Sequence, residues 1–383
     1  MREGWEYKRL IEVCDFQGGS QPPKAEWSKD PKPNYVRMLQ IRDFTQSATD
    51  YIEYVKVSKS LKYCKEDDIL IGRYGASVGK ILTGLAGAYN VAIIKSIPNE
   101  DIITKKYIKS YFLSPGFQLN LGKVSLHRAA QAGFSKEDIA DFVIPVPPVQ
   151  EQEKIVAELD CLSGIIEKKK QQLKELDNLA QSIFYDMFGD PITNEKGWEM
   201  KKLGDVGKVI TGNTPTTKDA ENYSSNDYCF IKPGDIGKDA VEIIEETEAH
   251  ISTKAYLSSR RLPIGSVLTT CIGIVGKVGI TSKEATCNQQ INAILPNSAM
   301  SSTYVANAIL LCRKVLETMA NAPVVPIINK GEFSSICIPF PPLDLQNAFA
   351  QKIEAIEKQK ELIKKSIQET ETLFNSRMDY WFN

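Results

Sequence analysis

The chain contains the same pattern of residues twice. A tryptophan-glutamate pair with a lysine and a leucine behind it occurs at Trp5, Glu6, Lys8 and Leu10, and again at Trp198, Glu199, Lys201 and Leu203. The longest match relates Phe134, Ser135, Ile144, Pro145, Pro147, Pro148 and Gln152 to Phe333, Ser334, Ile338, Pro339, Pro341, Pro342 and Gln346. Pro148 and Pro342 are 342 minus 148, or 194, residues apart, about half of the 383 residues. A period this long indicates one duplicated globular module and argues against a short-period solenoid.

Composition agrees with two folded modules. Hydrophobic residues make up 42% of the chain and charged residues 25%, which is ordinary for soluble proteins. No apolar run approaches the ~18 residues of a membrane span, and the first residues do not form an apolar signal segment, so we expect a cytoplasmic protein. The eight cysteines occur singly, without a CxxC pair, beside two histidines. We therefore expect reduced thiols and no metal site.

The net charge of −1 is not that of a chain that binds a polyanion by an overall basic excess. Any basic surface must be local. We expect weak nucleic-acid binding by the chain alone, with a partner subunit supplying part of the phosphate contact.

Two long amphipathic helices are expected, over residues 149–188 and 343–383. Apolar residues recur in alternating steps of four and three after each proline pair, and proline fits the first turn of a helix. At 1.5 Å per residue, roughly 40 residues span about 60 Å, so the helices must lie along each other or along a partner. The expected packing residues are Ile155, Leu159, Leu162, Ile166, Leu173, Leu176, Ile183, Ile353, Ile356, Ile363, Ile367 and Phe374.

Outside these helices lie two blocks with short apolar runs separated by Gly, Asn, Asp, Ser and Pro, which is typical of strands and turns. The expected strands include 35–41, 69–71, 91–94, 267–274, 278–280 and 291–295, and the expected helices are 105–113 and 302–317. We predict an α+β fold with mixed or antiparallel sheets. The second copy begins after Gly189, Asp190 and Pro191, where the first long helix stops.

Motifs for catalysis are incomplete. The segment from Gly75 to Lys80 looks like a phosphate loop, but three residues separate its glycines and Ile81 follows the lysine. A phosphate loop needs four residues there and then a Ser or Thr. We interpret this segment, and the related one from Gly273 to Lys277, as a hairpin that carries its lysine to a surface. With two histidines, neither of which repeats, a Ser/His/Asp site is not supported either.

The blocks do offer polar side chains next to glycines, of the kind that pair with bases or hold phosphates. The two copies share a framework but differ at these positions, which suggests that they read different targets. The candidates in the first copy are Ser20, Gln21, Arg37, Gln40, Arg42, Arg73, Tyr74, Ser77, Lys80 and Arg128. Those in the second copy are Asn213, Thr214, Thr216, Lys218, Lys232, Thr270, Lys277, Asn288, Gln289, Asn329 and Lys330.

This arrangement resembles the specificity (S) subunit of type I restriction-modification systems. The resemblance covers essentially the whole chain, and it rests on the duplicated opening with Trp5 and Trp198, the two Gly-Lys hairpins, and a repeated Ile-Pro-x-Pro-Pro segment followed by glutamine. These segments are Ile144, Pro145, Val146, Pro147, Pro148 and Gln152, then Ile338, Pro339, Phe340, Pro341, Pro342 and Gln346.

The resemblance implies a division into a first target-recognition domain (1–148), a central spacer helix (149–190), a second target-recognition domain (191–342) and a C-terminal spacer helix (343–383). Each domain would bind one half of a split, asymmetric site on double-stranded DNA, and the antiparallel helices would fix their separation. Two methyltransferase subunits would supply S-adenosylmethionine chemistry, and restriction subunits with ATP and Mg would supply cleavage. The chain itself would carry no cofactor, no metal and no catalysis.

Other interpretations remain open at this point. The same scaffold could serve a fused methylase-nuclease or another phage-defence methyltransferase as its recognition subunit. A coiled-coil adaptor that only joins other proteins is an alternative from another class. Sequence-selective DNA retention would distinguish these, and binding of S-adenosylmethionine by the isolated chain would favour an enzyme.

Overall fold

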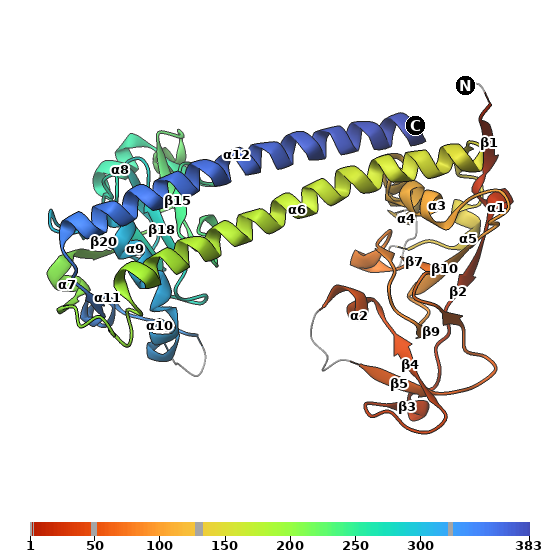
Figure 1. Cartoon of the computed structure of the whole chain (residues 1–383), viewed down its shortest axis with the longest axis horizontal. Helices are drawn as coiled ribbons and strands as arrows, with labels where there is room; N and C mark the ends of the chain where they lie inside the picture. The colour runs from red at the N-terminus through yellow and green to blue at the C-terminus, as the bar shows by residue number, and fades with distance from the viewer. Residues whose placement is uncertain (1, 3, 47–51, 127–132, 321–324) are drawn as a thin grey trace. The chain divides into compact units, whose positions relative to one another are not determined.

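The computed structural model describes residues 2, 4–46, 52–126, 133–320 and 325–383 (Figure 1). The chain divides into two compact units. The first unit comprises Met1–Lys169 and Ser366–Asn383, and the second comprises Lys170–Lys365. Each unit therefore combines one of the two sequence copies with part of both long helices. In the part of the chain that the structure describes, no helix is long and apolar enough to cross a membrane.

The first unit contains two sheets and a strand pair. An antiparallel sheet has the order β2 (Cys14–Gly18), β10 (Ile93–Pro98), β7 (Ile69–Gly72), β8 (Ile81–Leu82). A mixed sheet has the order β3 (Trp27–Ser28), β5 (Glu53–Lys56), β4 (Tyr35–Leu39), β9 (Gly87–Tyr89), β6 (Tyr63–Cys64), in which β4 and β9 are parallel. The separate pair is β1 (Glu6–Arg9) with β11 (Val143–Val146). The helices are α1 (Leu10–Val13), α2 (Ile41–Thr45), α3 (Lys105–Leu113), α4 (Pro115–Leu126) and α5 (Lys136–Ile139).

The second unit repeats this plan. One sheet has the order β13 (Gly207–Thr211), β20 (Ile291–Pro296), β17 (Val267–Thr270), β18 (Val278–Thr281), β15 (Glu242–Ile244). The other has the order β16 (His250–Ile251), β14 (Tyr228–Ile231), β19 (Ala285–Cys287), and β12 (Met200–Lys202) pairs with β21 (Cys337–Pro339). The shorter helices are α7 (Leu203–Val206), α8 (Thr253–Ser258), α9 (Ser302–Leu311), α10 (Arg313–Met319) and α11 (Lys330–Ser335). The predicted α+β class is confirmed.

The repeated glutamine explains how each long helix is joined to its sheet domain. The Gln152 side chain is fully buried, accepts from the Thr104 N–H at 2.8 Å and donates to the Pro147 carbonyl at 2.9 Å. Gln346 makes the same two bonds, from the Ser301 N–H at 2.9 Å and to the Pro341 carbonyl at 2.9 Å. The glutamine thus satisfies backbone groups at a helix start that would otherwise lack partners.

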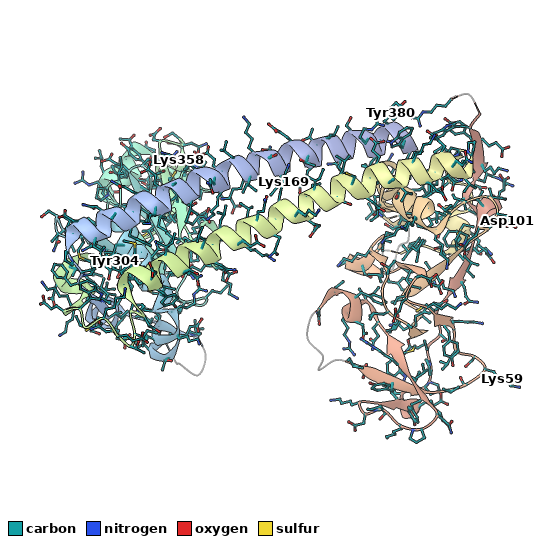
Figure 2. The ribbon with its side chains drawn as sticks, viewed as in Figure 1. Lys59, Asp101, Lys169, Tyr304, Lys358 and Tyr380 are labelled. Carbon is teal, nitrogen blue, oxygen red and sulfur yellow. The ribbon has the colours of Figure 1, made fainter. Side chains whose placement is uncertain are left out.

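The long helices are α6 (Val149–Phe188) and α12 (Leu343–Phe382). Within the first unit they pack antiparallel. Lys169 of α6, labelled in Figure 2, donates from Nζ to Ser366 Oγ at 2.7 Å, and Arg377 and Trp381 near the end of α12 bond to Glu158 near the start of α6. Within the second unit, Lys360 pairs with Asp177 at 2.8 Å.

Aromatic and aliphatic side chains fill the helix contacts in each unit. In the second unit, Phe184 stacks on Tyr304 with ring centroids 5.6 Å apart and meets Phe349 edge-on. Of the predicted packing residues, some are buried and others are half-buried. The buried ones are Ile155, Leu159, Ile166, Ile353, Ile356 and Ile367, and the half-buried ones are Leu162, Leu173, Leu176, Ile183, Ile363 and Phe374.

Four predicted elements differ in their bounds. The strand expected over 35–41 ends at Leu39, and Ile41 already begins α2. The strand expected over 91–94 begins at Ile93 and continues to Pro98. The helix expected over 302–317 is broken at Cys312, whose ψ of 8° leaves the α-helical range, and continues as α10. The strand expected over 267–274 ends at Thr270. There the Thr270 hydroxyl donates to the Ile274 carbonyl at 2.6 Å and accepts from the Lys277 N–H at 3.0 Å. These bonds close a turn and take the chain away from the sheet.

Candidate nucleic-acid interface

Strand ends of both sheets meet along one edge in each unit, which we name the reading edge. In the first unit it consists of the segments that follow β2, β4 and β7 and the one that precedes β10. In the second it consists of the segments that follow β13, β14 and β17 and the one that precedes β20. Three backbone hydrogen bonds join these segments in each unit, and they correspond one to one. In the first unit they run from Ser20 N to Tyr89 O, from Asn90 N to Leu39 O and from Arg73 N to Ala92 O. In the second unit they run, in the same order, from Asn213 N to Cys287 O, from Asn288 N to Ile231 O and from Cys271 N to Gln290 O.

A glycine makes this close contact possible in both units. A methyl group built on Gly19 would lie 2.0 Å from the Asn90 carbonyl oxygen, and one on Gly212 would lie 2.2 Å from the Asn288 carbonyl oxygen. No side chain fits such a gap, so glycine is required by packing at both positions. The neighbouring predicted residues Gln21 and Thr214 are both exposed at this edge.

Arg73 is the half-exposed cation of the first reading edge. Its Nε donates to the Phe134 carbonyl at 3.2 Å, and its guanidinium lies 5.1 Å from the centre of the Tyr74 ring. Tyr74 in turn forms an isolated antiparallel bridge with Gly133. The arginine is thereby held in one orientation with an aromatic face beside it, an arrangement suited to a planar, charged or π-rich ligand.

Other predicted polar residues of the first unit bond to the unit's own carboxylates. Arg37 pairs with Asp43 at 2.8 Å, and both Gln40 and Arg42 bond to Glu53, at 2.7 and 2.6 Å. These acids offset the positive charge around α2. A nucleic acid that contacts this region would have to compete with them.

The remaining predicted residues of the first unit have different roles. Ser77 donates to the Tyr74 carbonyl at 2.6 Å and closes the turn after β7, whereas Lys80 is exposed. Ser20 Oγ accepts from the Lys62 N–H at 3.3 Å. The predicted contact Arg128 lies outside the described residues.

In the second unit, polar residues on the reading edge bond to one another. Thr214 donates to Gln289 at 2.6 Å, and both are exposed. Asn213 accepts from the Arg260 N–H at 2.9 Å, while the Arg260 guanidinium donates to the Thr211 carbonyl at 2.7 Å. Arg260 was not among the predicted residues because it has no matching landmark in the first copy. The sequence feature that could have indicated Arg260 is its position two residues before the apolar Leu262, which is buried.

Lys232 and the segment around Thr216 extend the polar surface of the second unit. The Lys232 ammonium lies 5.7 Å from the centre of the Phe230 ring. Thr216 accepts from the Lys218 N–H at 3.3 Å, and Lys218 is exposed. Asn329 caps α11 by accepting from the Glu332 N–H at 3.0 Å, and the next residue, Lys330, is exposed.

Three predicted residues of the second unit are buried or hydrogen-bonded within their own unit. Thr270 is fully buried, and Asn288 is 8% exposed and bonds to Gln290 at 2.9 Å. Lys277 donates to the Pro233 carbonyl at 2.8 Å and to the Ile236 carbonyl at 2.7 Å. We do not include these three in the proposed interface.

Five of the six buried cysteines have thiols whose pKa is raised by burial. Burial raises the pKa of the Cys14, Cys287 and Cys312 thiols to about 12, and that of the Cys64 and Cys271 thiols to about 11. These thiols remain protonated at neutral pH, and the thiolate is the reactive form. All eight cysteines, each within the described residues, are free thiols.

Comparison with known proteins identifies the family. The family model described as "Type I restriction modification DNA specificity domain" matches residues 2–178 and 195–372. The chain is 32% identical to the HindI specificity subunit of Haemophilus influenzae, over 42% of this chain and 36% of that subunit. It is 19% identical to the EcoBI specificity subunit of Escherichia coli, over 93% of this chain and 80% of that subunit.

A solved structure has the same fold along nearly the whole length. It belongs to work on complex assembly and conformational transition of the type I R-M system, and the match has a TM-score of 0.62 at 18% identity, over 99% of this chain and 97% of that chain. Two matches of the family model, separated by 16 residues and covering most of the chain, agree with the repeat seen in the sequence and in the sheets. The chain belongs to the type I restriction-modification DNA specificity family.

Proposed function

We propose that this chain is the sequence-reading subunit of a type I restriction-modification complex and that each unit reads one half of a bipartite, asymmetric DNA site. The observation that carries the proposal is the pair of reading edges, which share their backbone bonds but present different side chains. A shared framework gives two domains of the same shape, and different side chains give them different base preferences. Membership of the specificity family supports the same conclusion.

The proposed contacts are the exposed or half-exposed residues of these edges. In the first unit, Arg73 and Gln21 have donors suited to guanine and adenine, and Lys80 has a point charge suited to a phosphate. In the second unit, Thr214, Gln289 and Arg260 take the corresponding part. Arg37 and Arg42 are paired with acids of their own unit. We therefore propose that they stabilise the reading edge and do not contact DNA.

The proposal places catalysis on other subunits. Two methyltransferase subunits would bind S-adenosylmethionine, and restriction subunits would bind ATP and Mg, in a cytoplasmic complex. The net charge of −1 supports a division of the phosphate contacts between this chain and its partners.

The test is to co-express the chain with its neighbouring methyltransferase subunit and to map N6-methyladenine across the host genome. The expected result is one bipartite, asymmetric motif. Gln21→Ala should relax or change only one half of that motif, and Thr214→Ala only the other half, so that each variant is the control for the other. A stable complex that methylates without a motif would refute the proposal, as would a variant in one unit that alters both halves.

We also propose that the helix lengths set the separation of the two half-sites. The test inserts seven residues, about two turns, between Lys174 and Glu175 of α6 and a matching seven between Leu362 and Ile363 of α12. The insertions keep the apolar stripes in phase. A longer spacer with unchanged half-sites is expected, and changed half-site bases would contradict this role.

A further inference from the structure

A cysteine, a histidine and a glutamate come together in the second unit, away from its reading edge. Cys229 of β14 and His250 of β16 are direct partners in the antiparallel register of these strands. Residues directly opposite each other have Cβ atoms about 4.5–5.5 Å apart on one face of a sheet. The register therefore brings a thiol and an imidazole into reach of one ligand.

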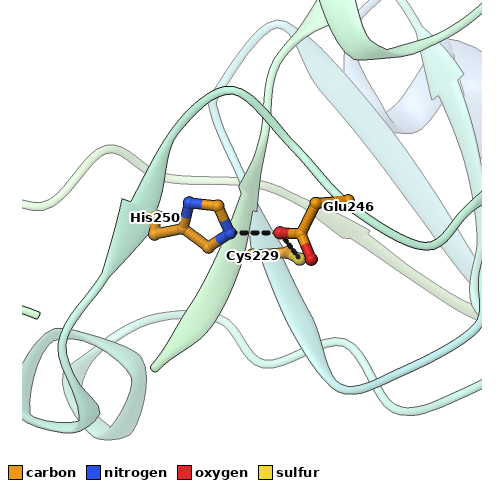
Figure 3. Close-up of side chains that lie close together, drawn as sticks. All are labelled: Cys229, Glu246 and His250. Atoms are coloured by element: carbon orange, nitrogen blue, oxygen red, sulfur yellow. Dashed lines mark hydrogen bonds and ion pairs between the residues drawn. The ribbon is translucent and has the colours of Figure 1, made fainter. Parts of the chain in front are cut away.

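Glu246 completes the group. Figure 3 shows its carboxylate between the His250 ring and the Cys229 sulfur. One oxygen, Oε1, bonds to His250 Nε2 and accepts from Cys229 Sγ at 3.7 Å, whereas the other, Oε2, pairs with Lys283 Nζ at 3.0 Å. The sulfur, the ring nitrogen and the carboxylate oxygen all lie within 4.8 Å of one another.

We propose that Cys229, Glu246 and His250 form a binding site for one divalent ion of the zinc class. Thiolate, imidazole and carboxylate are the ligands that zinc takes in proteins, at about 2.0–2.3 Å, and a sulfur ligand excludes calcium and magnesium as the preferred ions. Ligand atoms around a tetrahedral ion lie roughly 3.3–3.8 Å apart at those bond lengths. Glu246 is the residue that has to move, so that Oε1 separates from the ring nitrogen.

The surroundings fit such an ion. The three residues line a cavity of about 360 Å³, together with Asp227, Lys283 and others, which leaves room for a water as fourth ligand. The Cys229 side chain is buried, whereas Glu246 is exposed and can shift. Binding would release the thiol proton to solvent, and Lys283 would keep its bond to Oε2 as an outer partner.

Metal binding at this site does not depend on the proposed role in DNA recognition. Cys229 lies at the start of β14, whereas the reading edge begins where β14 ends, at Ile231. A metal here would join β14, β16 and the loop between Glu246 and His250 as a local cross-link. The sequence predicted no metal because these ligands have no motif spacing, and only the strand register brings Cys229 next to His250.

The test uses the purified full chain, treated with a chelator and then titrated with Co²⁺, which takes zinc sites and reports thiolate ligation by a charge-transfer absorption band. We expect one Co²⁺ per chain, displaced by Zn²⁺, with the band absent in Cys229→Ser. We also expect His250→Gln and Glu246→Gln to weaken binding at least tenfold. The control is Cys337→Ser, which removes an exposed cysteine elsewhere in the unit and should leave the band unchanged.

A second measurement guards against misfolded variants. Zn²⁺ should raise the thermal midpoint of the original chain and of Cys337→Ser, but not that of His250→Gln, whose circular dichroism without metal should match the original chain. Binding of less than one Co²⁺ per chain would overturn the proposal. A thiolate band that survives Cys229→Ser, or that disappears in Cys337→Ser, would overturn it as well.

Discussion

Arg73 in the first unit takes the place that Cys271 has in the second. Each donates its backbone N–H to the segment before the neighbouring strand of the sheet. Arg73 donates to the Ala92 carbonyl before β10, and Cys271 donates to the Gln290 carbonyl before β20. One side chain is a half-exposed guanidinium and the other a buried thiol. The repeated backbone therefore does not determine what a position contributes to the surface.

The hairpin lysines differ in the same way. Gly72 and Thr270, which end β7 and β17, hold the lysines at the same point of the turn through backbone bonds to Lys80 and Lys277. Lys80 is exposed, but the Lys277 ammonium bonds to two backbone carbonyls of its own unit. Residues that align in sequence are thus exposed in one copy and bonded within the fold in the other. The predictions below test where the units are equal and where they differ.

The largest effect should come from the element that is equal in both units. Gln152→Ala and Gln346→Ala each leave buried backbone groups without partners, and each should cost about 3 kcal/mol of stability. The loss should appear in the unit that carries the substitution, as measured by hydrogen exchange of its amides. Gln150→Ala and Asn347→Ala, at exposed positions one or two residues away, are the controls. If one glutamine were dispensable, the two junctions would not be equivalent.

The same contrast explains what could be predicted from sequence. The starts of α6 and α12 at Val149 and Leu343, and the whole of α3, follow from local signals: proline pairs, apolar periodicity and a capping threonine at Thr104. The role of Lys277 could not be predicted, because its partners Pro233 and Ile236 lie 44 and 41 residues earlier in the chain. The family resemblance carried the function, and it did so through landmarks that serve packing, such as Gln152 and Gln346.

The next effect separates the two lysines. Lys277→Met removes donors to the Pro233 and Ile236 carbonyls and should destabilise the second unit by about 2 kcal/mol. Lys80→Met should change the stability of the first unit by less than about 0.5 kcal/mol. It should instead weaken DNA binding by the assembled complex for all sequences alike, as a phosphate contact does. Chemical denaturation and binding at several salt concentrations measure both. Equal stability losses would mean that the two hairpins serve the fold alike.

The helix contacts differ in charge between the units. Lys360 is buried in the second unit and pairs with Asp177 and Glu357, each at 2.8 Å. Burial lowers the pKa of Lys360, but the two acids reverse this, and the pKa stays above its ordinary value. Asp177→Asn removes one of these acids and should cost about 1 kcal/mol. Ser366→Ala, which removes a hydroxyl partner of Lys169 in the first unit, should cost about half as much.

A further variant sharpens this comparison. Lys360→Met removes the buried charge and keeps the apolar stem. The double variant Lys360→Met with Asp177→Asn should therefore be as stable as the original chain or more stable. Thermal denaturation of the single and double variants measures the coupling. A double variant that loses the sum of both single effects would show that the ion pair contributes nothing beyond its parts.

The smallest effect concerns pH and distinguishes the outer ends of the helices. In the first unit, the hydrogen bond from Arg377 lowers the pKa of the Glu158 carboxyl below its ordinary value of 4.5, and a bond from Trp381 adds to this. A lowered pKa in the folded state means that the stabilisation is present above pH 4.5 and is lost as the pH falls through the folded value. Because the pair is partly exposed, the effect should be below about 1 kcal/mol.

The original chain should therefore be more stable than Glu158→Gln at about pH 7, and the stabilities of the two should converge as the pH falls below 4.5. The position 194 residues on is the exposed Lys352, so Lys352→Gln should show no such convergence. If Lys352→Gln converged as well, the acid dependence would not come from Glu158, and the two units would again be equal at this point.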